Sequence, residues 1–158
     1  MGMKLKELFS FRFYIKKLLE LKDQPEETAR GLALGVFIGF LPVNGFQVLI
    51  AITIAAFAKA SKIAAAIGTH VTNPWTTVPV LIIDYYVGYR ILRLLGYQVM
   101  RVSLSTFSIS KLFSTGLALL VPTFVGGASL GLIFSILSYF GFKKFAENIK
   151  EKQNVETA

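Results

Sequence analysis

Long uncharged stretches alternate with short clusters of basic residues along this chain. Three stretches stand out, apolar apart from Asp84 in the second, and each is divided near its middle: residues 31–58, 63–87 and 112–142. The arms of the first stretch measure about 11 to 16 residues each, shorter than the roughly 20 residues that a helix needs to cross a bilayer at a right angle. A helix-break-helix hairpin therefore fits this stretch better than two full crossings.

Proline lies in all three breaks. Pro42-Val-Asn-Gly45 divides the first stretch, Asn73-Pro74 to Pro79 the second, and Pro122 with Gly126-Gly127 the third. We predict an all-α integral membrane protein with three helical hairpins, at least two of them re-entrant, over residues 25–58, 63–95 and 112–142. The third stretch could instead make one kinked, tilted crossing.

The N-terminal segment, residues 1–24, has the pattern of a basic amphipathic helix. Such a helix lies along a membrane surface with its apolar side down, attracted to anionic lipid. The alternative is a helix packed on the cytoplasmic side of the protein itself. At the other end, residues 143–158 are expected to form a basic polar tail. The apolar positions of the N-terminal pattern are Leu8, Phe11, Ile15, Leu18 and Leu19.

Every lysine and arginine lies outside the three breaks. If each stretch is a hairpin, all of these bases lie on one face of the membrane, as the positive-inside rule favours for the cytoplasm. The sequence thus predicts a multi-pass or re-entrant protein of the bacterial inner membrane, with its basic loops and N-terminus on the cytoplasmic side.

Glycines recur at every fourth position in two of the stretches. Gly31, Gly35 and Gly39 would share one helix face, and Gly127 and Gly131 repeat the spacing. Such faces let helix backbones approach closely in lipid, so these glycines are interpreted as packing residues without a chemical role.

Composition supports the membrane interpretation and excludes some kinds of functional site. Of the 158 residues, 54% are hydrophobic and 16% charged, and the mean hydropathy is +0.60; soluble domains have about 25% charged residues. The lack of cysteine excludes thiolate chemistry, and a single histidine argues against a histidine-based metal site, so no metal and no cofactor are expected. The bases lie between apolar segments and at the termini, which favours lipid headgroups over nucleic acid as partner.

Polar residues gather in and near the first two breaks. Unwound backbone inside a bilayer must be buried in protein or line a wet cavity, and broken helices that point at a midplane site recur in secondary transporters. The alternative is that these residues only cap helix ends and bond to each other at the turns. The predicted ligand-binding residues are Arg30, Pro42, Asn44, Gln47, His70, Thr72, Asn73, Trp75, Thr76 and Asp84.

Asp84 is a separate case, because an ionisable group at membrane depth is costly and is by default a functional candidate. It could bind a cation, relay a proton or pair with a base such as Arg30. The alternative places it near the headgroups in an aromatic cluster with Tyr85, Tyr86 and Tyr89. His70 also has a plainer interpretation, as a hydrogen-bonding partner at the turn.

Two runs of sequence resemble a known family. PEETARGLALGVFIGFLPVNGFQ, from Pro25 to Gln47, and IGTHVTNPWTTVPV, from Ile67 to Val80, resemble an uncharacterised family of small bacterial membrane domains with G-x-x-P-x-x-G-x-Q and G-T-x-x-x-N-P-x-T motifs. Some relatives are fused to glycosyltransferase domains that look like users of lipid-linked sugars. Paired re-entrant hairpins also resemble, in general plan, membrane families implicated in carrying polyprenyl-phosphate lipids.

These features favour a small oligomeric carrier or flippase-like protein that binds an anionic lipid or small solute at the facing breaks. The alternative is a non-transporting scaffold or accessory protein for a lipid-linked-sugar or envelope enzyme, with a glycosyltransferase-type partner. A homo-oligomer is expected, since a chain of this length can barely shield two unwound breaks from lipid. An enzyme is not expected: there is no G-x-S-x-G elbow, and Glu26 and Glu27 fit the first turn of a helix. The bases expected to attract a phosphate are Arg30, Lys59, Lys62 and Arg90.

Overall fold

The computed structural model describes residue 18 and residues 24–43, 45–72, 75–99 and 112–156. These residues form helices, with no strand among them. The all-α class is therefore confirmed. The elements are α3 (Pro25–Phe40), α4 (Gln47–Phe57), α5 (Lys62–Gly68), the 3₁₀ helix η1 (Thr69–Val71), α6 (Thr77–Leu94) and α7 (Leu112–Glu156).

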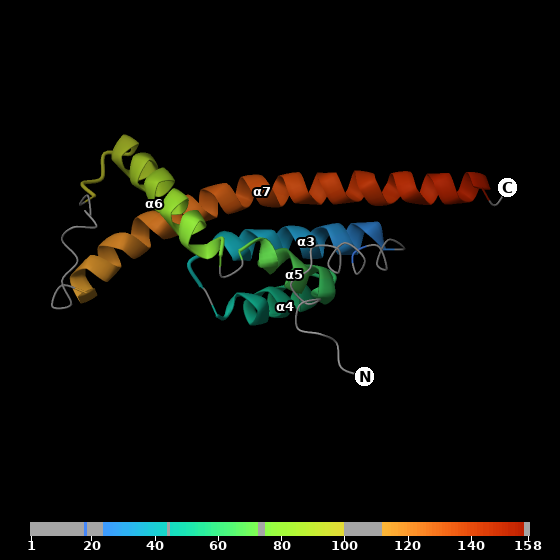
Figure 1. The fold of residues 1–158 in the computed structure, drawn as a ribbon, viewed down its shortest axis with the longest axis horizontal. Helices are drawn as coiled ribbons and strands as arrows, with labels where there is room; N and C mark the ends of the chain where they lie inside the picture. Colours follow the sequence, from blue (N-terminus) through green and yellow to red (C-terminus); the bar gives the residue numbers. More distant parts are fainter. Residues whose placement is uncertain (1–17, 19–23, 44, 73–74, 100–111, 157–158) are drawn as a thin grey trace.

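Helix α7 forms the long axis of the molecule, and α3 and α6 pack on it (Figure 1). α3 runs antiparallel beside the middle of α7, and α6 crosses α7 nearer its start (Figure 1). α4 and α5 pack on α3 at the side away from α7. α3 is thus the central helix, between α7 and the pair formed by α4 and α5.

The first break lies where the sequence predicts it. α3 ends at Phe40, α4 begins at Gln47, and α4 runs back beside α3 (Figure 1). Leu41 is extended (φ −77°, ψ 146°), as the residue before a proline prefers, and Gly45 has a φ of +92°, which glycine adopts without strain. The core between α3, α4 and α5 consists of Ile38, Ala51, Ala55, Ala60 and Ala65.

The second stretch is broken where expected, but its two arms do not pair. η1 ends at Val71 and α6 begins at Thr77. α6 then leaves α5 and packs mainly on α7 (Figure 1). The predicted hairpin over residues 63–95 is wrong in this respect, because Gly88 of α6 fits closely against the backbone of α7.

The third predicted hairpin is also wrong, since residues 112–156 form the single helix α7 with Pro122 inside it. The helix bends where α6 crosses it (Figure 1), and a proline in a helix interior causes such kinks. Gly126 and Gly127 are helical and hold the backbone of α7 against α6 and α3. The alternative of one kinked helix describes this stretch, and the expected polar tail from residue 143 continues the same helix up to Glu156.

Glycines set the close approach between helices, as predicted. A Cβ built on Gly31 of α3 would overlap the carbonyl of Ser61, and Gly35 is equally close to α5. Where α6 crosses α7, a Cβ on Gly88 would overlap the carbonyl of Pro122. Backbone contacts of this kind are what small residues permit between membrane helices.

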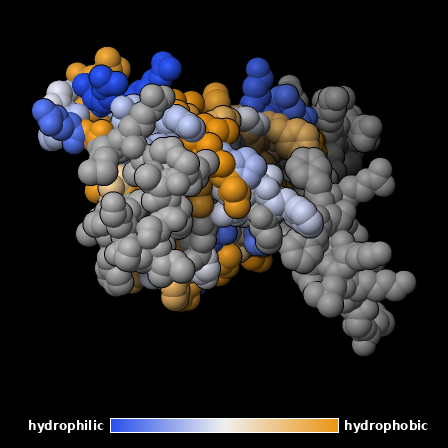
Figure 2. Space-filling model, turned by 60° about the vertical axis from the view of Figure 1, so that its left-hand side comes forward, coloured by the Kyte–Doolittle hydropathy of each residue, from blue (hydrophilic) through white to orange (hydrophobic). Residues whose placement is uncertain are grey.

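Among the described residues, one helix is long and apolar enough to cross a membrane: α7, over Ala118–Ile149, with a mean hydropathy of 1.9. Large hydrophobic side chains are also exposed on α4, α5, α6 and α7, and Figure 2 shows hydrophobic residues in the middle of one face. α7 follows Lys111 in the sequence and reaches Lys143 without reversing. Lys143 lies inside the candidate span, and the expected placement of all bases on one face of a membrane stays a prediction.

Most of the predicted surface helix over residues 1–24 lies outside the described residues. Leu18 is described, and it packs against Ala29, Phe142 and Ala146, where α3 meets α7. This contact agrees with the alternative in which the segment packs on the protein itself.

Candidate functional site

The two predicted breaks meet through Thr72. Its hydroxyl donates to the carbonyl oxygen of Gly39, in the last turn of α3, over 2.9 Å, and lies 3.3 Å from Oε1 of Gln47, the first residue of α4. A hydroxyl has one proton to donate, so a Gln47 amide turned the other way would donate its N–H to Thr72 instead. The side chain of Thr72 is buried. Two predicted site residues from different breaks, Gln47 and Thr72, are therefore in contact.

Two helices begin at this junction of α3, α4 and α6. α4 follows Phe46 and α6 follows Thr76, and neither residue caps its helix with its side chain. The hydroxyl of Thr76 donates to the carbonyl of Val71 over 3.2 Å. The first N–H groups of a helix carry partial positive charge and favour anionic ligands. The N-terminus of α4 thus adjoins Thr72 through Gln47, and the N-terminus of α6 follows the same break, next to η1.

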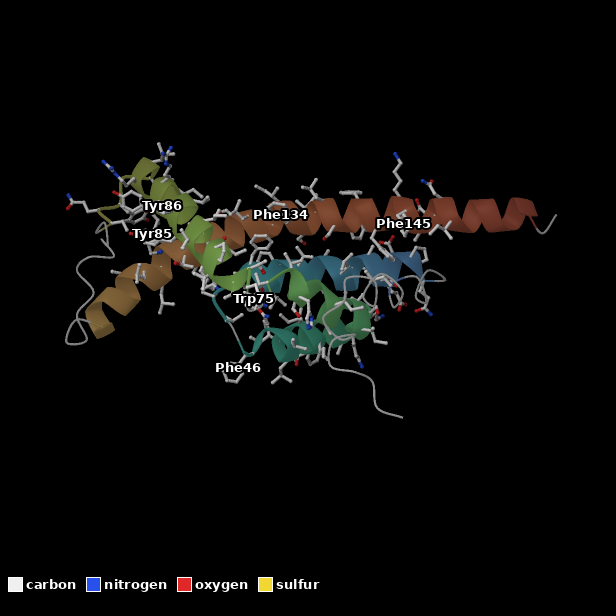
Figure 3. The ribbon with its side chains drawn as sticks, viewed as in Figure 1. Phe46, Trp75, Tyr85, Tyr86, Phe134 and Phe145 are labelled. Carbon is white, nitrogen blue, oxygen red and sulfur yellow. The ribbon has the colours of Figure 1, made fainter. Side chains whose placement is uncertain are left out.

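Other predicted residues surround the junction. Nδ1 of His70 lies 2.9 Å from the carbonyl oxygen of Ala66, one turn earlier, which agrees with a hydrogen-bonding role at the turn. Trp75 is 89% exposed and lies, like Phe46, at the surface of its break (Figure 3). Pro42 lines a shallow apolar groove together with Leu120, Val121, Phe124 and Val125 of α7.

Arg30 is far from the junction. It lies nine residues before Gly39 on α3, about 13 Å along the helix axis, and its Nε contacts the carbonyl oxygen of Glu26 at 3.4 Å. The structure therefore does not bring Arg30 together with Gln47 and Thr72. Asn44 and Asn73 lie outside the described residues, so their part in the site stays a prediction.

Asp84 is enclosed where α6 crosses α7. Its side chain is fully buried, and neither carboxylate oxygen has a hydrogen-bond partner among the described residues. Oδ2 lies 3.4 Å from the position that a Cβ would take on Gly127, and the carbonyl of Phe40 adjoins the same glycine. Asp84 therefore lies inside a junction of α3, α6 and α7. Whether this junction lies near the headgroups or deeper in a membrane stays a prediction.

One polar cluster was not predicted. Glu26, in the first turn of α3, pairs with Nζ of Lys143 at 2.8 Å and accepts a hydrogen bond from the hydroxyl of Tyr139. The hydrogen bond from Lys143, and then that from Tyr139, hold the pKa of Glu26 below its ordinary value. Tyr139 and Lys143 are four residues apart and so share a helix face, which the sequence could have shown. Their partner Glu26 lies 113 residues from Tyr139, and the spacing of residues in the sequence does not predict this contact.

Comparison with known proteins places the chain in a family. Searches of curated proteins and of solved structures found no match. A family model described as "Uncharacterized protein conserved in bacteria (DUF2062)" matches residues 8–154. This match covers both breaks, the buried Asp84 and nearly all of α7. The chain therefore belongs to this family of uncharacterized bacterial proteins, in agreement with the resemblance that its two motifs indicated.

Proposed function

We propose that this protein is a small membrane carrier that binds an anionic lipid headgroup or small anionic solute at the junction of α3, α4 and α6. The observation that carries the proposal is the contact of Thr72 with Gly39 and Gln47, which joins two helix breaks at one point. Interrupted helices of this kind place backbone N–H groups and helix dipoles at a ligand in the interior of transporters. The apolar length of α7 and the exposed hydrophobic side chains support a bilayer as the setting.

The side chains at the junction suit a phosphate or carboxylate. The amide of Gln47 is able to donate a hydrogen bond through its NH2 group, and the N-termini of α4 and α6 add favourable dipoles. The hydroxyl of Thr72 donates its proton to the carbonyl oxygen of Gly39 and lies beside Gln47, so in this proposal it positions the Gln47 amide. Arg30, Lys59 and Lys62 gather at the other end of the helices, where Ser61 N–H bonds the carbonyl of Glu27. In this proposal they attract an anionic ligand to that face but do not hold it at the junction.

Native mass spectrometry of the full chain, extracted from its own membrane in mild detergent, tests the proposal. Wild type is compared with Thr72→Val, which keeps the side-chain shape but removes the hydroxyl. Thr53→Val is the matched control, because the hydroxyl of Thr53 bonds only the carbonyl of Leu49 in its own helix, over 2.8 Å, among the described contacts. We expect a discrete anionic-lipid adduct on wild type and on Thr53→Val, and its loss from a folded Thr72→Val.

The contrary results are equally specific. If the adduct persists in Thr72→Val, the ligand does not bind at the junction. No specific adduct on wild type, together with a change of subunit assembly in Thr72→Val, would mean that the breaks are structural joints. The scaffold hypothesis, with an enzyme partner, would then explain the protein better.

A further inference from the structure

Asp84 carries a buried carboxyl group that the proposed anion site does not use. Its side chain is 0% exposed, and both oxygens lack a hydrogen-bond partner among the described residues. Its backbone lies so close to α7 that a Cβ on Gly126 would overlap the carbonyl of Asp84. An ionised carboxylate in such a place loses its hydration and gains no partner, which is costly.

The helices around Asp84 bring no positive charge to it. α7 has no charged residue between positions 112 and 142, and α3 has none between 31 and 40. On α6, the charged neighbours are Arg90 and Arg93, about 9 and 13 Å further along the axis, and both are exposed. The remaining titratable groups of α6 are the phenols of Tyr85, Tyr86 and Tyr89, whose rings contact each other.

The end of α3 makes ionisation still less favourable. The carbonyl of Phe40, the last residue of α3, adjoins Gly127, and Oδ2 of Asp84 lies close to the same glycine. The C-terminal carbonyls of a helix carry partial negative charge. These carbonyls would therefore repel the negative charge of an ionised Asp84, and they would attract a cation or a proton.

A proton suits this place better than a metal ion. Metal cations need several oxygen or nitrogen ligands and a space of their own, and the described part of the chain has no group of three His, Cys, Asp or Glu side chains that could hold one. The backbones are also in contact, because a Cβ on Gly88 would overlap the carbonyl of Pro122. A proton needs no added space and leaves a neutral group that requires only one acceptor for its O–H.

We infer that Asp84 is a proton-binding site, neutral while α6 is packed on α7 and ionised only when α6 moves away from α7. α6 begins at Thr77, and the hydroxyl of Thr76 before it bonds the carbonyl of Val71, the neighbour of Thr72, so such a movement would also alter the anion site. The inference deepens the proposed carrier by naming a proton as its driving ion, and only this coupling rests on the carrier proposal.

The chain offers a residue-specific test, because Asp23 and Asp84 are its only aspartates. The full chain is labelled with carbon-13 at the aspartate carboxyl carbon, placed in lipid nanodiscs and titrated by NMR. In Asp23→Asn, the one remaining signal is that of Asp84; in Asp84→Asn, it is that of Asp23. We expect Asp84 to stay protonated to a pH at least about one unit above the midpoint of Asp23, a tenfold or greater gain in proton affinity.

A carboxylate signal from Asp84 wherever Asp23 is ionised would overturn the inference. Asp84→Asn imitates the neutral carboxyl and is expected to keep the helical content of wild type. Should it fail to fold, wild type still gives both signals, and the signal retained in Asp23→Asn identifies Asp84. No ligand or transport is measured, so this result and the lipid-adduct result can fail independently.

Discussion

The hydroxyl of Thr72 donates to the carbonyl oxygen of Gly39 over 2.9 Å, across 33 residues of sequence. That carbonyl belongs to the last turn of α3, where a helix runs out of its own N–H donors. Gln47, at the start of α4, adjoins the same hydroxyl. The buried side chain of Thr72 thus satisfies a carbonyl group at the end of α3, and it links the two interrupted stretches of the chain.

Removing this hydroxyl should destabilise the fold without unfolding it. Thr72→Val leaves the Gly39 carbonyl buried and without its side-chain donor, at an expected cost of about 1–3 kcal/mol. Thermal unfolding in mild detergent should show a lower Tm for Thr72→Val, with Thr72→Ser in between and Thr53→Val close to wild type. Equal melting of Thr72→Val and Thr53→Val would show that the hydrogen bond contributes little.

The crossing of α6 and α7 should tolerate no added methyl group. In Gly88→Ala, the new Cβ would overlap the carbonyl of Pro122, and forcing two packed backbones apart costs about 1–3 kcal/mol. Gly141→Ala is the matched control on α7, because its Cβ would meet nothing within 4 Å and alanine is the better helix former. We expect a lower Tm for Gly88→Ala and an unchanged or higher Tm for Gly141→Ala. A Gly88→Ala protein as stable as wild type would contradict this close packing.

The first two breaks could be predicted because the residues that make them act locally. Pro42 restricts Leu41, and Gly45 supplies a positive φ, whatever surrounds them. Pro122 is the same kind of signal but lies inside α7. A proline in a helix costs about 3 kcal/mol, and here the contact of Gly88 with the Pro122 carbonyl accompanies a bend instead of a turn. The outcome depended on a helix more than 30 residues away.

The candidate site was predictable to a similar extent. Gln47 and Thr72 were identified as polar residues beside helix-ending residues, and they do meet. The burial of Asp84 depends on which face of α7 packs against α6. The spacing of hydrophobic residues along α6 does not predict that face. Glu26 was interpreted as a first-turn acid, because its partners on α7 are distant in the chain.

Acid should weaken the contact between α3 and α7. Lys143 and Tyr139 hold the pKa of Glu26 below its ordinary value of 4.5, so the ionised form stabilises the folded state. This contribution is complete above the pKa of the unfolded chain and is lost as the pH falls through the lower, folded-state pKa. Glu26→Gln should therefore lower the Tm at neutral pH and reduce its further fall in acid.

Glu27→Gln is the control, because Glu27 is exposed in the same turn of α3. The measurement is the Tm of wild type and both variants in detergent, from neutral to acidic pH. Parallel curves for Glu26→Gln and wild type would mean that the cluster of Glu26, Tyr139 and Lys143 does not stabilise the fold.

The turn between α3 and α4 should need a glycine because of its backbone conformation, and not because a side chain would lack space. Gly45 has a φ of +92°, and a Cβ built on it would meet nothing within 4 Å. Gly45→Ala should therefore cost about 1–2 kcal/mol through left-handed strain, and Gly45→Asn less, because asparagine tolerates that region. Gly116→Ala separates the strain from the added methyl group, since Gly116 is helical and equally unobstructed. If the Tm of Gly45→Ala matched that of Gly116→Ala, the turn would be able to adopt another conformation. The contact of Thr72 with Gly39 would then not depend on the positive φ of Gly45.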